Sequence, residues 1–341
     1  MLVSGDPTVI TRRQGRIGRI TLNRPKALNA LDPCMIQAVH QALDGWRGDP
    51  AVHAVVIEGA GGEGAGGRAF CAGGDIRLIR DMVRDGDHAG VEAFFAAEYA
   101  MVLAIARYPK PCVSLIDGVC MGGGMGLSMH GTARVATEAA LFAMPETGIG
   151  LFPDVGATYA LPRLRPGCGM YMGLTGARLG GADALWAGVA THYTSRETLA
   201  GLADEMAESG IAALGSATVQ TFDAVLPYAT AHLRAFEGDS VEAVVAGLAD
   251  DGSDWAERAL QALRAASPSS VMWSFEGIRR GAGRSLEECL QAELALTRHA
   301  TRQPDFLEGV RAMVVDKDRA PRWSPATLAA VDRADIAALF A

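Results

Sequence analysis

Apolar and polar residues follow two different periods along the first half of this 341-residue chain. Ile17 to Leu22 alternates as a strand does, and Val52 to Ile57 and Cys112 to Ile116 are short apolar runs typical of buried strands. Asp32-Pro33 has the signature of a helix start, with Asp as the N-cap, and predicts a helix that runs to about Trp46. Strands that alternate with helices predict an α/β core.

The same pattern predicts further elements down to residue 143. Ile76 to about Ala106 reads as helical, with an interruption near Asp85 to Asp87, and Arg134 to Ala136 and Leu141 to Ala143 read as short strands. Six of the nine residues from Gly59 to Gly67 are glycine, so this segment is predicted to be a flexible loop.

Beyond Gly181 the chain becomes rich in helix-forming patterns. The candidate helices are Ala182–Ala187, Thr198–Ser209, Val241–Gly247, Asp254–Ala266, Ser269–Arg280 and Ser285–Ala300. The glycine-flanked break at Gly176 to Gly181 therefore predicts two parts. Residues 1–180 would form an α/β core that carries the catalytic loops, and residues 181–341 a helical region packed on that core.

Composition and charge limit the partners that this chain would have. A net charge of -8 and a pI near 5.4 argue against a nucleic-acid partner. No apolar run is expected to approach the roughly 20 residues of a membrane span, and Met1 to Arg13 lacks the apolar centre of a secretory signal. The six cysteines form no C-x-x-C pair and no zinc spacing, so we expect reduced, buried cysteines, no metal site and a cytoplasmic protein.

The most informative candidate chemistry lies between residues 117 and 163. Gly122 to Gly124 separate the strand-like run Pro111–Ile116 from the helix-like run Met125–His130. Glycine lets a backbone N–H approach a ligand, and an N–H at a helix start carries partial positive charge. Two carboxylates, Glu146 and Asp154, follow in apolar or glycine-rich sequence. This combination suits a reaction in which a carbonyl oxygen gains negative charge beside an acid or base.

Several segments in a fixed order carry a family resemblance. They are Arg24–Leu31 (RPKALNAL), Phe70–Ile76 (FCAGGDI), Glu98-Tyr99, Gly118–Leu127, Phe142–Gly156 (FAMPETGIGLFPDVG), and Glu308–Ala312 with Asp316–Asp318. The chain resembles the crotonase (enoyl-CoA hydratase/isomerase) superfamily, and within it most closely the 3-hydroxyisobutyryl-CoA hydrolases. The resemblance extends from about Ile17 to Ala341.

The resemblance implies a fold and an activity. The core would show the repeated ββα spiral of the superfamily, with the helical C-terminal region packed against it. The activity would be hydrolysis of the thioester of a short branched 3-hydroxyacyl-CoA, of the 3-hydroxyisobutyryl-CoA type, as in valine degradation. Such a reaction would need no metal and no redox cofactor. Coenzyme A would enter the site as part of the substrate and not as a resident cofactor. Members of the superfamily often assemble as homo-oligomers.

The resemblance also implies roles for individual site residues. The backbone N–H groups of Gly74 and Gly123 would form an oxyanion hole for the thioester oxygen. Glu146 would attack the thioester carbonyl or activate a water for that attack, and the residues leave these two roles open. Asp154 would contact the substrate hydroxyl, and Glu98 would be a further substrate contact.

Two of these segments would bind coenzyme A. The Arg24–Leu31 turn and the Ala72–Asp75 loop would hold its adenine end through backbone groups, which assigns Ala27, Ala72, Gly73 and Asp75 to this site. Lys26 would contribute a point charge to a phosphate.

One position departs from the hydratase pattern. True hydratases place a second glutamate at the end of a Gly-Gly-Gly-x-Glu motif, and this chain has Gly126 there. Loss of a general acid or base costs about 10²–10⁴-fold, so efficient hydration is disfavoured. Two alternatives to hydrolysis remain: an enoyl-CoA hydratase or isomerase with Glu146 as its sole base, and a non-catalytic acyl-CoA-binding subunit. Only hydrolysis releases free thiol.

Overall fold

The computed structural model describes residues 7–61, 69–217 and 223–340. Contacts between Cα atoms divide the chain into two compact units. Unit 1 comprises residues 1–74, 100–142 and 179–224, and unit 2 comprises residues 75–99, 143–178 and 225–341. The chain therefore passes between the units several times.

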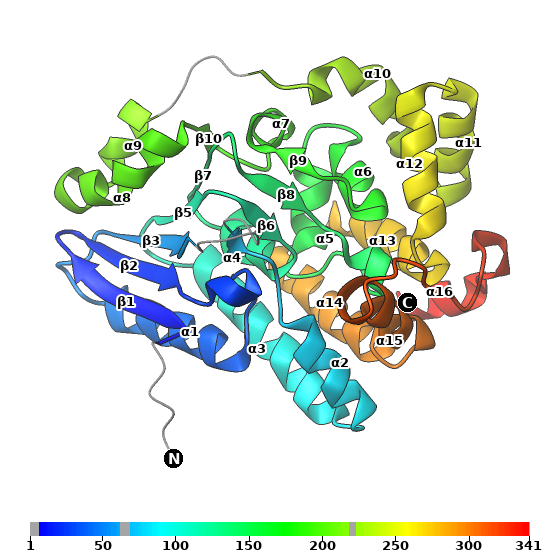
Figure 1. Ribbon diagram of the computed structural model, residues 1–341, viewed down its shortest axis with the longest axis horizontal. Coiled ribbons are helices and arrows are strands. Elements are labelled where there is room, and N and C mark those ends of the chain that lie inside the picture. Colours follow the sequence, from blue (N-terminus) through cyan, green and yellow to red (C-terminus); the bar gives the residue numbers. More distant parts are fainter. Residues whose placement is uncertain (1–6, 62–68, 218–222, 341) are drawn as a thin grey trace. The chain divides into compact units, whose positions relative to one another are not determined.

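The main sheet of unit 1 has six strands in the order β1-β2-β3-β5-β7-β10 (Figure 1). β1 pairs antiparallel with β2, and every other pairing in this sheet is parallel. Parallel strands buried on both faces explain the continuous apolar runs in the sequence. The bounds are β1 Val9–Gln14, β2 Ile17–Leu22, β3 Ala54–Gly59, β5 Cys112–Ile116, β7 Ala133–Ala136 and β10 His192–Tyr193.

A second sheet of four short strands has the order β4-β6-β8-β9. Its strands are β4 Ala69–Cys71, β6 Val119–Met121, β8 Leu141–Ala143 and β9 Leu179–Gly180. β4 and β6 run parallel, and the glycine loops after each of them carry the predicted oxyanion donors. This sheet is therefore the part of unit 1 that brings those two loops together.

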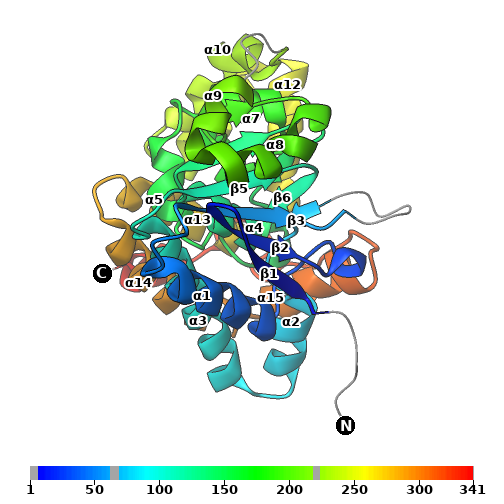
Figure 2. The same cartoon turned by 90° about the vertical axis from the view of Figure 1, so that its left-hand side faces the viewer.

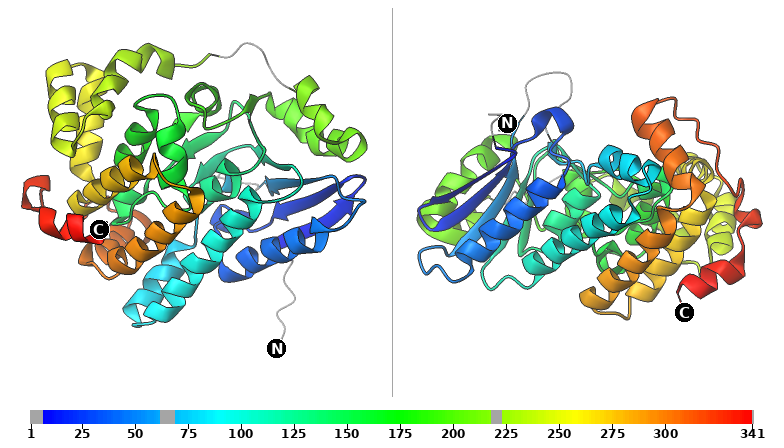
Figure 3. Two further views of the ribbon diagram at one scale, coloured as in Figure 1. Left: turned by 180° about the vertical axis from the view of Figure 1, so that it is seen from behind. Right: turned by 90° about the horizontal axis from the view of Figure 1, so that it is seen from below.

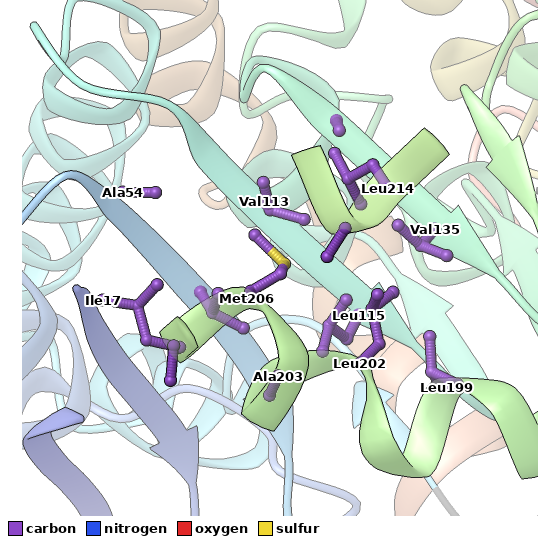
Figure 4. Packing of buried hydrophobic residues seen from close by; sticks show 14 residues of the cluster. Ile17, Ala54, Val113, Leu115, Val135, Leu199, Leu202, Ala203, Met206 and Leu214 are labelled. Atoms are coloured by element: carbon purple, nitrogen blue, oxygen red, sulfur yellow. The ribbon is translucent and has the colours of Figure 1, made fainter. Parts of the chain in front are cut away.

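Helices cover the six-stranded sheet. α8 lies against β2 and packs Leu202, Ala203 and Met206 onto Ile17 and Val113 in a fully apolar cluster (Figure 4). α1 packs on β1 and β2, as Figure 2 shows. The helices assigned to unit 1 are α1 Pro33–Arg47, α4 Gly123–Met129, α7 Gly181–Ala187, α8 Arg196–Ser209 and α9 Ala213–Ala217.

Unit 2 is built almost entirely from helices. α13 packs against α5, α6 and α14, and α11 lies side by side with α12 (Figures 1 and 3). Its helices are α2 Ile76–Arg84, α5 Ala157–Ala160, α6 Cys168–Thr175, α10 Thr230–Leu233, α11 Val241–Asp251, α12 Asp254–Ala265, α13 Pro268–Gly281, α14 Leu286–Ala300, α15 Pro304–Val310 and α16 Arg333–Leu339. α3 (His88–Ala106) begins in unit 2 and ends in unit 1.

The predicted α/β class with a helical C-terminal region is confirmed, and each predicted strand and helix has a counterpart within a few residues. The division at residue 180 stays a prediction: a crossing between the units falls at Arg178–Leu179, but residues after 181 contribute to both units. Most of the glycine-rich segment predicted to be a loop, from Gly59 to Gly67, lies outside the described residues.

α3 corrects the expectation that no apolar run approaches a membrane span. Its 19 residues are long and apolar enough to cross a bilayer, and it is the one such helix in the described ranges. However, 44% of its apolar stretch is buried inside the protein, and the core helices of soluble proteins have the same length and composition. α3 also carries a buried glutamate, Glu98.

The start of α4 touches β4 so closely that it tolerates no side chain. A Cβ at Gly124 would lie 2.2 Å from the carbonyl oxygen of Cys71. By contrast, a Cβ at Gly45, an exposed position within α1, would meet nothing within 4 Å. The two glycines therefore offer a matched pair for testing this packing.

We expect Gly124→Ala to destabilise the protein by about 1–3 kcal/mol, because α4 must move away from β4. Gly45→Ala should stabilise it by about 0.5–1 kcal/mol, because alanine removes the entropic cost of a mid-helix glycine. Denaturant unfolding measures both changes. A Gly124→Ala variant as stable as Gly45→Ala would contradict the close contact.

Candidate functional site

Glu146 begins a short 3-10 turn, η2 (Glu146–Ile149), which Met144 and Pro145 connect to the end of β8. Its side chain is 6% exposed, and its Oε2 atom is buried without a hydrogen-bond partner. The turn itself is firmly held. The backbone N–H of Ser267 donates to the carbonyl oxygen of Thr147 at 3.0 Å, and the Thr147 hydroxyl donates to Leu174 O at 3.3 Å. The backbone next to Glu146 is thus fixed, and one oxygen of its side chain is left without a protein partner.

The late Glu308–Ala312 segment supports this turn. A Cβ at Gly309 would lie 2.6 Å from the backbone of Ile149, so α15 contacts the η2 backbone directly. Arg311 follows, and its guanidinium pairs with Glu308 at 2.8 Å and with Asp318 at 2.6 Å. The residues that carried the subgroup resemblance late in the chain therefore pack against the turn that presents Glu146.

Asp154 is 7% exposed and is held from its side-chain end by Tyr99. The Tyr99 hydroxyl donates to Asp154 Oδ2 at 2.7 Å. The two residues that follow, Val155 (φ 54°) and Gly156 (φ 80°), both lie in the left-handed region. That conformation is strained for a β-branched residue such as valine, and strain of this kind gathers at functional sites.

Glu98 projects from α3 and is 2% exposed, with Oε1 buried and unpartnered. Glu98, Glu146 and Asp154 influence one another electrostatically, so the structure brings these three predicted residues together within unit 2. In the described part of the chain, no Lys, Arg or His forms an ion pair with any of them. The cluster is therefore a buried, uncompensated set of acids.

Burial dominates the acidity of this cluster. It raises the pKa of Glu98 and of Glu146 well above the usual range, and the negative charge of Asp154 raises both further. Burial also raises the pKa of Asp154 to about 6, against the opposing hydrogen bonds from Tyr99 and from its own backbone N–H. Carboxylates with raised pKa values are stronger bases than exposed ones and suit proton transfer near neutral pH.

Two residues of this region were not assigned a role from the sequence. Tyr99 was noted only as part of the Glu98-Tyr99 pair. Glu293, 1% exposed on α14, accepts hydrogen bonds from the segment after Asp154. The sequence does contain a signal for Glu293: it lies three or four positions from Cys289, Leu290 and Leu296, which form the apolar, buried face of the helix. A glutamate on the apolar face of a helix is rarely accidental.

The two predicted oxyanion donors lie on neighbouring loops of unit 1. Gly73 adopts φ 106°, and a Cβ there would lie 3.4 Å from the backbone nitrogen of Gly123. Gly122 forms the N-cap of α4 with φ 49°. Among the described residues, the N–H groups of Gly74 and Gly123 donate no backbone hydrogen bond. Both donors are therefore available to an acceptor from outside the protein.

The residues predicted to bind coenzyme A fall mostly on adjoining segments of unit 1. The N–H of Ala72 donates to Leu28 O at 3.0 Å, which ties the Ala72–Gly74 loop to the turn that contains Lys26 and Ala27. Buried Asn29 stabilises this turn by donating to Ala69 O at 2.8 Å. Lys26 is exposed.

Asp75 differs from the other residues predicted to bind coenzyme A. It is the first residue of unit 2, and its carboxylate caps α2 by accepting from the N–H of Leu78 at 3.3 Å. This local role accounts for an aspartate at the position.

Comparisons with known proteins identify the relatives of this chain. The profile of the enoyl-CoA hydratase/isomerase family matches residues 17–340. The mitochondrial 3-hydroxyisobutyryl-CoA hydrolase of Xenopus laevis is 42% identical, over 95% of this chain and 86% of its own length. The enzyme of the same name from Danio rerio is 43% identical, over 95% of this chain and 86% of its own length. The enzyme of that name from Homo sapiens is 41% identical, over 96% of this chain and 87% of its own length.

Two solved structures superpose on nearly the whole chain. One is a carnitinyl-CoA dehydratase from Mycobacterium thermoresistibile, with a TM-score of 0.92 and 36% identity over 98% of this chain and 97% of its own. The other is an enoyl-CoA hydratase from Rhodobacter sphaeroides, with a TM-score of 0.91 and 40% identity over the same shares. The crotonase-like fold expected from the sequence motifs is thereby confirmed.

One expectation from the sequence is wrong. The cysteine pattern and the lack of a secretory signal predicted a cytoplasmic protein, but the curated relatives are named as mitochondrial enzymes. Reduced cysteines are common to both compartments, so that pattern could not distinguish them.

The raised pKa of Asp154 makes a prediction about stability. A carboxyl whose pKa rises from 3.8 to about 6 on folding stabilises the protein below pH 4 and loses that contribution as the pH rises through 6. If this group acted alone, the loss would be ~3 kcal/mol. We therefore expect Asp154→Asn to raise the melting temperature at pH 8 and to change it little at pH 3.5, below the pKa of the unfolded carboxyl. A variant that melts below wild type at both pH values would contradict this electrostatic cost.

Proposed function

The chain belongs to the enoyl-CoA hydratase/isomerase (crotonase) family, and we propose that within it this protein hydrolyses the thioester of a short branched 3-hydroxyacyl-CoA. The substrate would be of the 3-hydroxyisobutyryl-CoA type, which would give the enzyme a place in valine degradation. The observation that carries the proposal is the buried acidic cluster of Glu98, Glu146 and Asp154.

In this proposal the thioester oxygen accepts hydrogen bonds from the N–H groups of Gly74 and Gly123. The bonds strengthen as negative charge builds up on that oxygen, so they favour the tetrahedral intermediate over the ground state. Within the described residues neither N–H group donates to a backbone acceptor, which supports this role. One such donor is worth about 2.7–4 kcal/mol in known enzymes.

Glu146 supplies the base or the nucleophile. As a nucleophile, its oxygen bonds to the carbonyl carbon, the C–S bond breaks, and water then hydrolyses the acyl-glutamate anhydride. As a base, it takes a proton from a water whose oxygen attacks the same carbon. In both routes the coenzyme A thiolate leaves and acquires a proton. The free Oε2 atom supports either role. Both roles require the ionised carboxylate, whose raised pKa makes it a stronger base than an exposed glutamate.

Asp154 and Glu98 would recognise the acyl group. Asp154 accepts a hydrogen bond from the substrate 3-hydroxyl and helps position it or the proton transfer, while Tyr99 holds the carboxylate. Glu98 offers its unpartnered Oε1 as a further contact. Buried polar atoms without a protein partner are costly, so a site built on them discriminates strongly against a substrate that cannot pair with them.

Coenzyme A would be held by backbone groups of Ala27, Ala72 and Gly73 and of Asp75, with exposed Lys26 near a phosphate. No resident cofactor or metal ion takes part in the proposed reaction. Within the described residues, His, Cys, Asp and Glu form no group of three that could hold a metal.

Hydration is the competing activity, since the two superposed structures are named as a dehydratase and a hydratase. Position 126 argues against it here: Gly126 lies buried within α4 and contributes no side chain. An assay of thiol release and of double-bond loss, run on hydroxyacyl- and enoyl-CoA esters, separates the two. Thiol release from the hydroxyacyl esters supports hydrolysis; hydration without thiol contradicts it. Binding without any turnover would support a non-catalytic acyl-CoA-binding subunit.

We predict that Glu146→Gln lowers kcat for thioester hydrolysis by about 10²–10⁴-fold, because the amide keeps the shape but removes the base and nucleophile. Binding of the coenzyme A ester, measured by calorimetry, should survive. Glu92→Gln is the control, since Glu92 lies partly exposed on α3 and pairs with Arg298. Retention of more than about a tenth of the wild-type kcat in Glu146→Gln would exclude this role.

We predict that Asp154→Asn lowers kcat mainly for 3-hydroxyacyl-CoA esters, with a smaller effect on acyl-CoA esters that lack the hydroxyl. The reason is that Asp154 is proposed to contact that hydroxyl, not the thioester. Steady-state kinetics on a matched pair of esters measures the difference. An equal loss on both esters would mean that Asp154 acts on the thioester or on the leaving group.

A further inference from the structure

Glu293 is a buried carboxylate that the proposed reaction does not use. It lies on α14 among apolar side chains, and only 1% of it is exposed. Burial raises its pKa to about 8, although three hydrogen bonds to its oxygens favour the charged form. A group that is so costly to bury calls for a role.

All three of those hydrogen bonds come from the short segment that follows Asp154. Oε2 accepts from the backbone N–H of Gly156 at 2.7 Å. Oε1 accepts from the backbone N–H of Thr158 at 3.0 Å and from its hydroxyl at 2.5 Å. Glu293 thus satisfies the N–H groups at the start of α5 from another helix, 135 or more positions away in sequence.

The segment that Glu293 binds is strained. Val155 and Gly156 are both left-handed, and Val155 is a buried β-branched residue. Such a conformation persists only where its surroundings enforce it. The strained pair directly follows Asp154, whose own carbonyl oxygen accepts from the N–H of Ala157 at 2.8 Å. The direction of the Asp154 carboxylate therefore depends on this turn at one end and on Tyr99 at the other.

We propose that Glu293 is a positioning residue: by holding the Val155–Thr158 turn it sets the place from which Asp154 meets the substrate hydroxyl. This assignment rests on the proposed role of Asp154. Both oxygens of Glu293 must accept, so glutamine cannot replace it. The amide nitrogen would face the backbone N–H of either Gly156 or Thr158, neither of which can accept, and the turn would lose its register.

The test compares single and double variants on the matched pair of esters. We expect Glu293→Gln to lower kcat for the 3-hydroxyacyl-CoA ester at least tenfold and for the ester lacking the hydroxyl less than threefold, as we expect for Asp154→Asn. In the Asp154→Asn background, Glu293→Gln should lower kcat less than twofold further, because the two residues act as one unit. Thr158→Val removes one of the three contacts and should give an intermediate loss, which Thr158→Ser should restore.

Glu288→Gln is the matched control. Glu288 lies on the same helix and also accepts from a backbone N–H and a hydroxyl, those of Ser285 at 2.8 and 2.9 Å, but at an exposed position. It should leave both rates within twofold of wild type. A thermal melt of each variant accompanies the kinetics. If Glu293→Gln fails to fold, Thr158→Val against Thr158→Ser decides the question alone.

Three results would overturn the assignment: a folded Glu293→Gln with near-normal kcat, an equal loss on both esters, or full additivity with Asp154→Asn. Each of these leaves the proposed function intact, because the wild-type enzyme still hydrolyses the hydroxyacyl ester. A wild-type enzyme that releases no thiol from either ester would instead contradict the proposed function, and this assignment with it.

Discussion

Several carboxyl groups of unit 2 are buried without an ion pair to any described Lys, Arg or His, and the rest of the unit depends on this constraint. Glu98, Glu146 and Asp154 are each less than a tenth exposed. The charge of Asp154 raises the pKa of both glutamates, and the charge of Glu98 raises the pKa of Glu146 further. Such a cluster lowers its energetic cost by holding protons to a higher pH, and left to itself it would also open to water. It persists because the surrounding backbone is fixed by other contacts. We infer that the unpartnered oxygens of Glu98 and Glu146 accept hydrogen bonds from a bound substrate. In the free protein these buried oxygens lower the stability of the fold at the proposed site.

Most of those fixing contacts come from residues far along the chain. Ser267 and Gly309 hold the η2 turn that presents Glu146, and Glu293 holds the turn after Asp154. The helical C-terminal region therefore fixes the turns that carry Glu146 and Asp154, which lie more than a hundred residues earlier in the chain. Unit 1 contributes a different element, two backbone N–H groups on glycine loops that a four-stranded sheet brings together. Our proposal assigns the two sets complementary tasks on one thioester: charge stabilisation and proton transfer.

The sequence predicts this protein well where the signal is local. The helix capped by Asp32, the break at Asp85 to Asp87 and the strand at Cys112 all appear, because caps, breakers and apolar runs act over a few residues. The three-residue strands β4 and β6 were missed, since they exist only through pairing within the four-stranded sheet. Likewise Tyr99 and Glu293 gain their roles from contacts across 55 and 137 residues, which no spacing reveals. Location in the cell leaves no trace in the cysteine pattern. The predicted site residues came from motif order, and their buried setting came from the structure.

The account depends on whether these acids hold protons that exposed acids would have lost. The most direct measurement is a carbon-13 NMR titration of the carboxyl groups in the folded enzyme, with Glu98→Gln, Glu146→Gln and Asp154→Asn used to assign the signals. The account predicts that Glu98 and Glu146 titrate well above the range of exposed glutamates, that Asp154 titrates near pH 6, and that removing one acid lowers the pKa of its neighbours. If all three groups titrate near the values of exposed side chains, each independently of the others, the cluster is solvated and the account is contradicted.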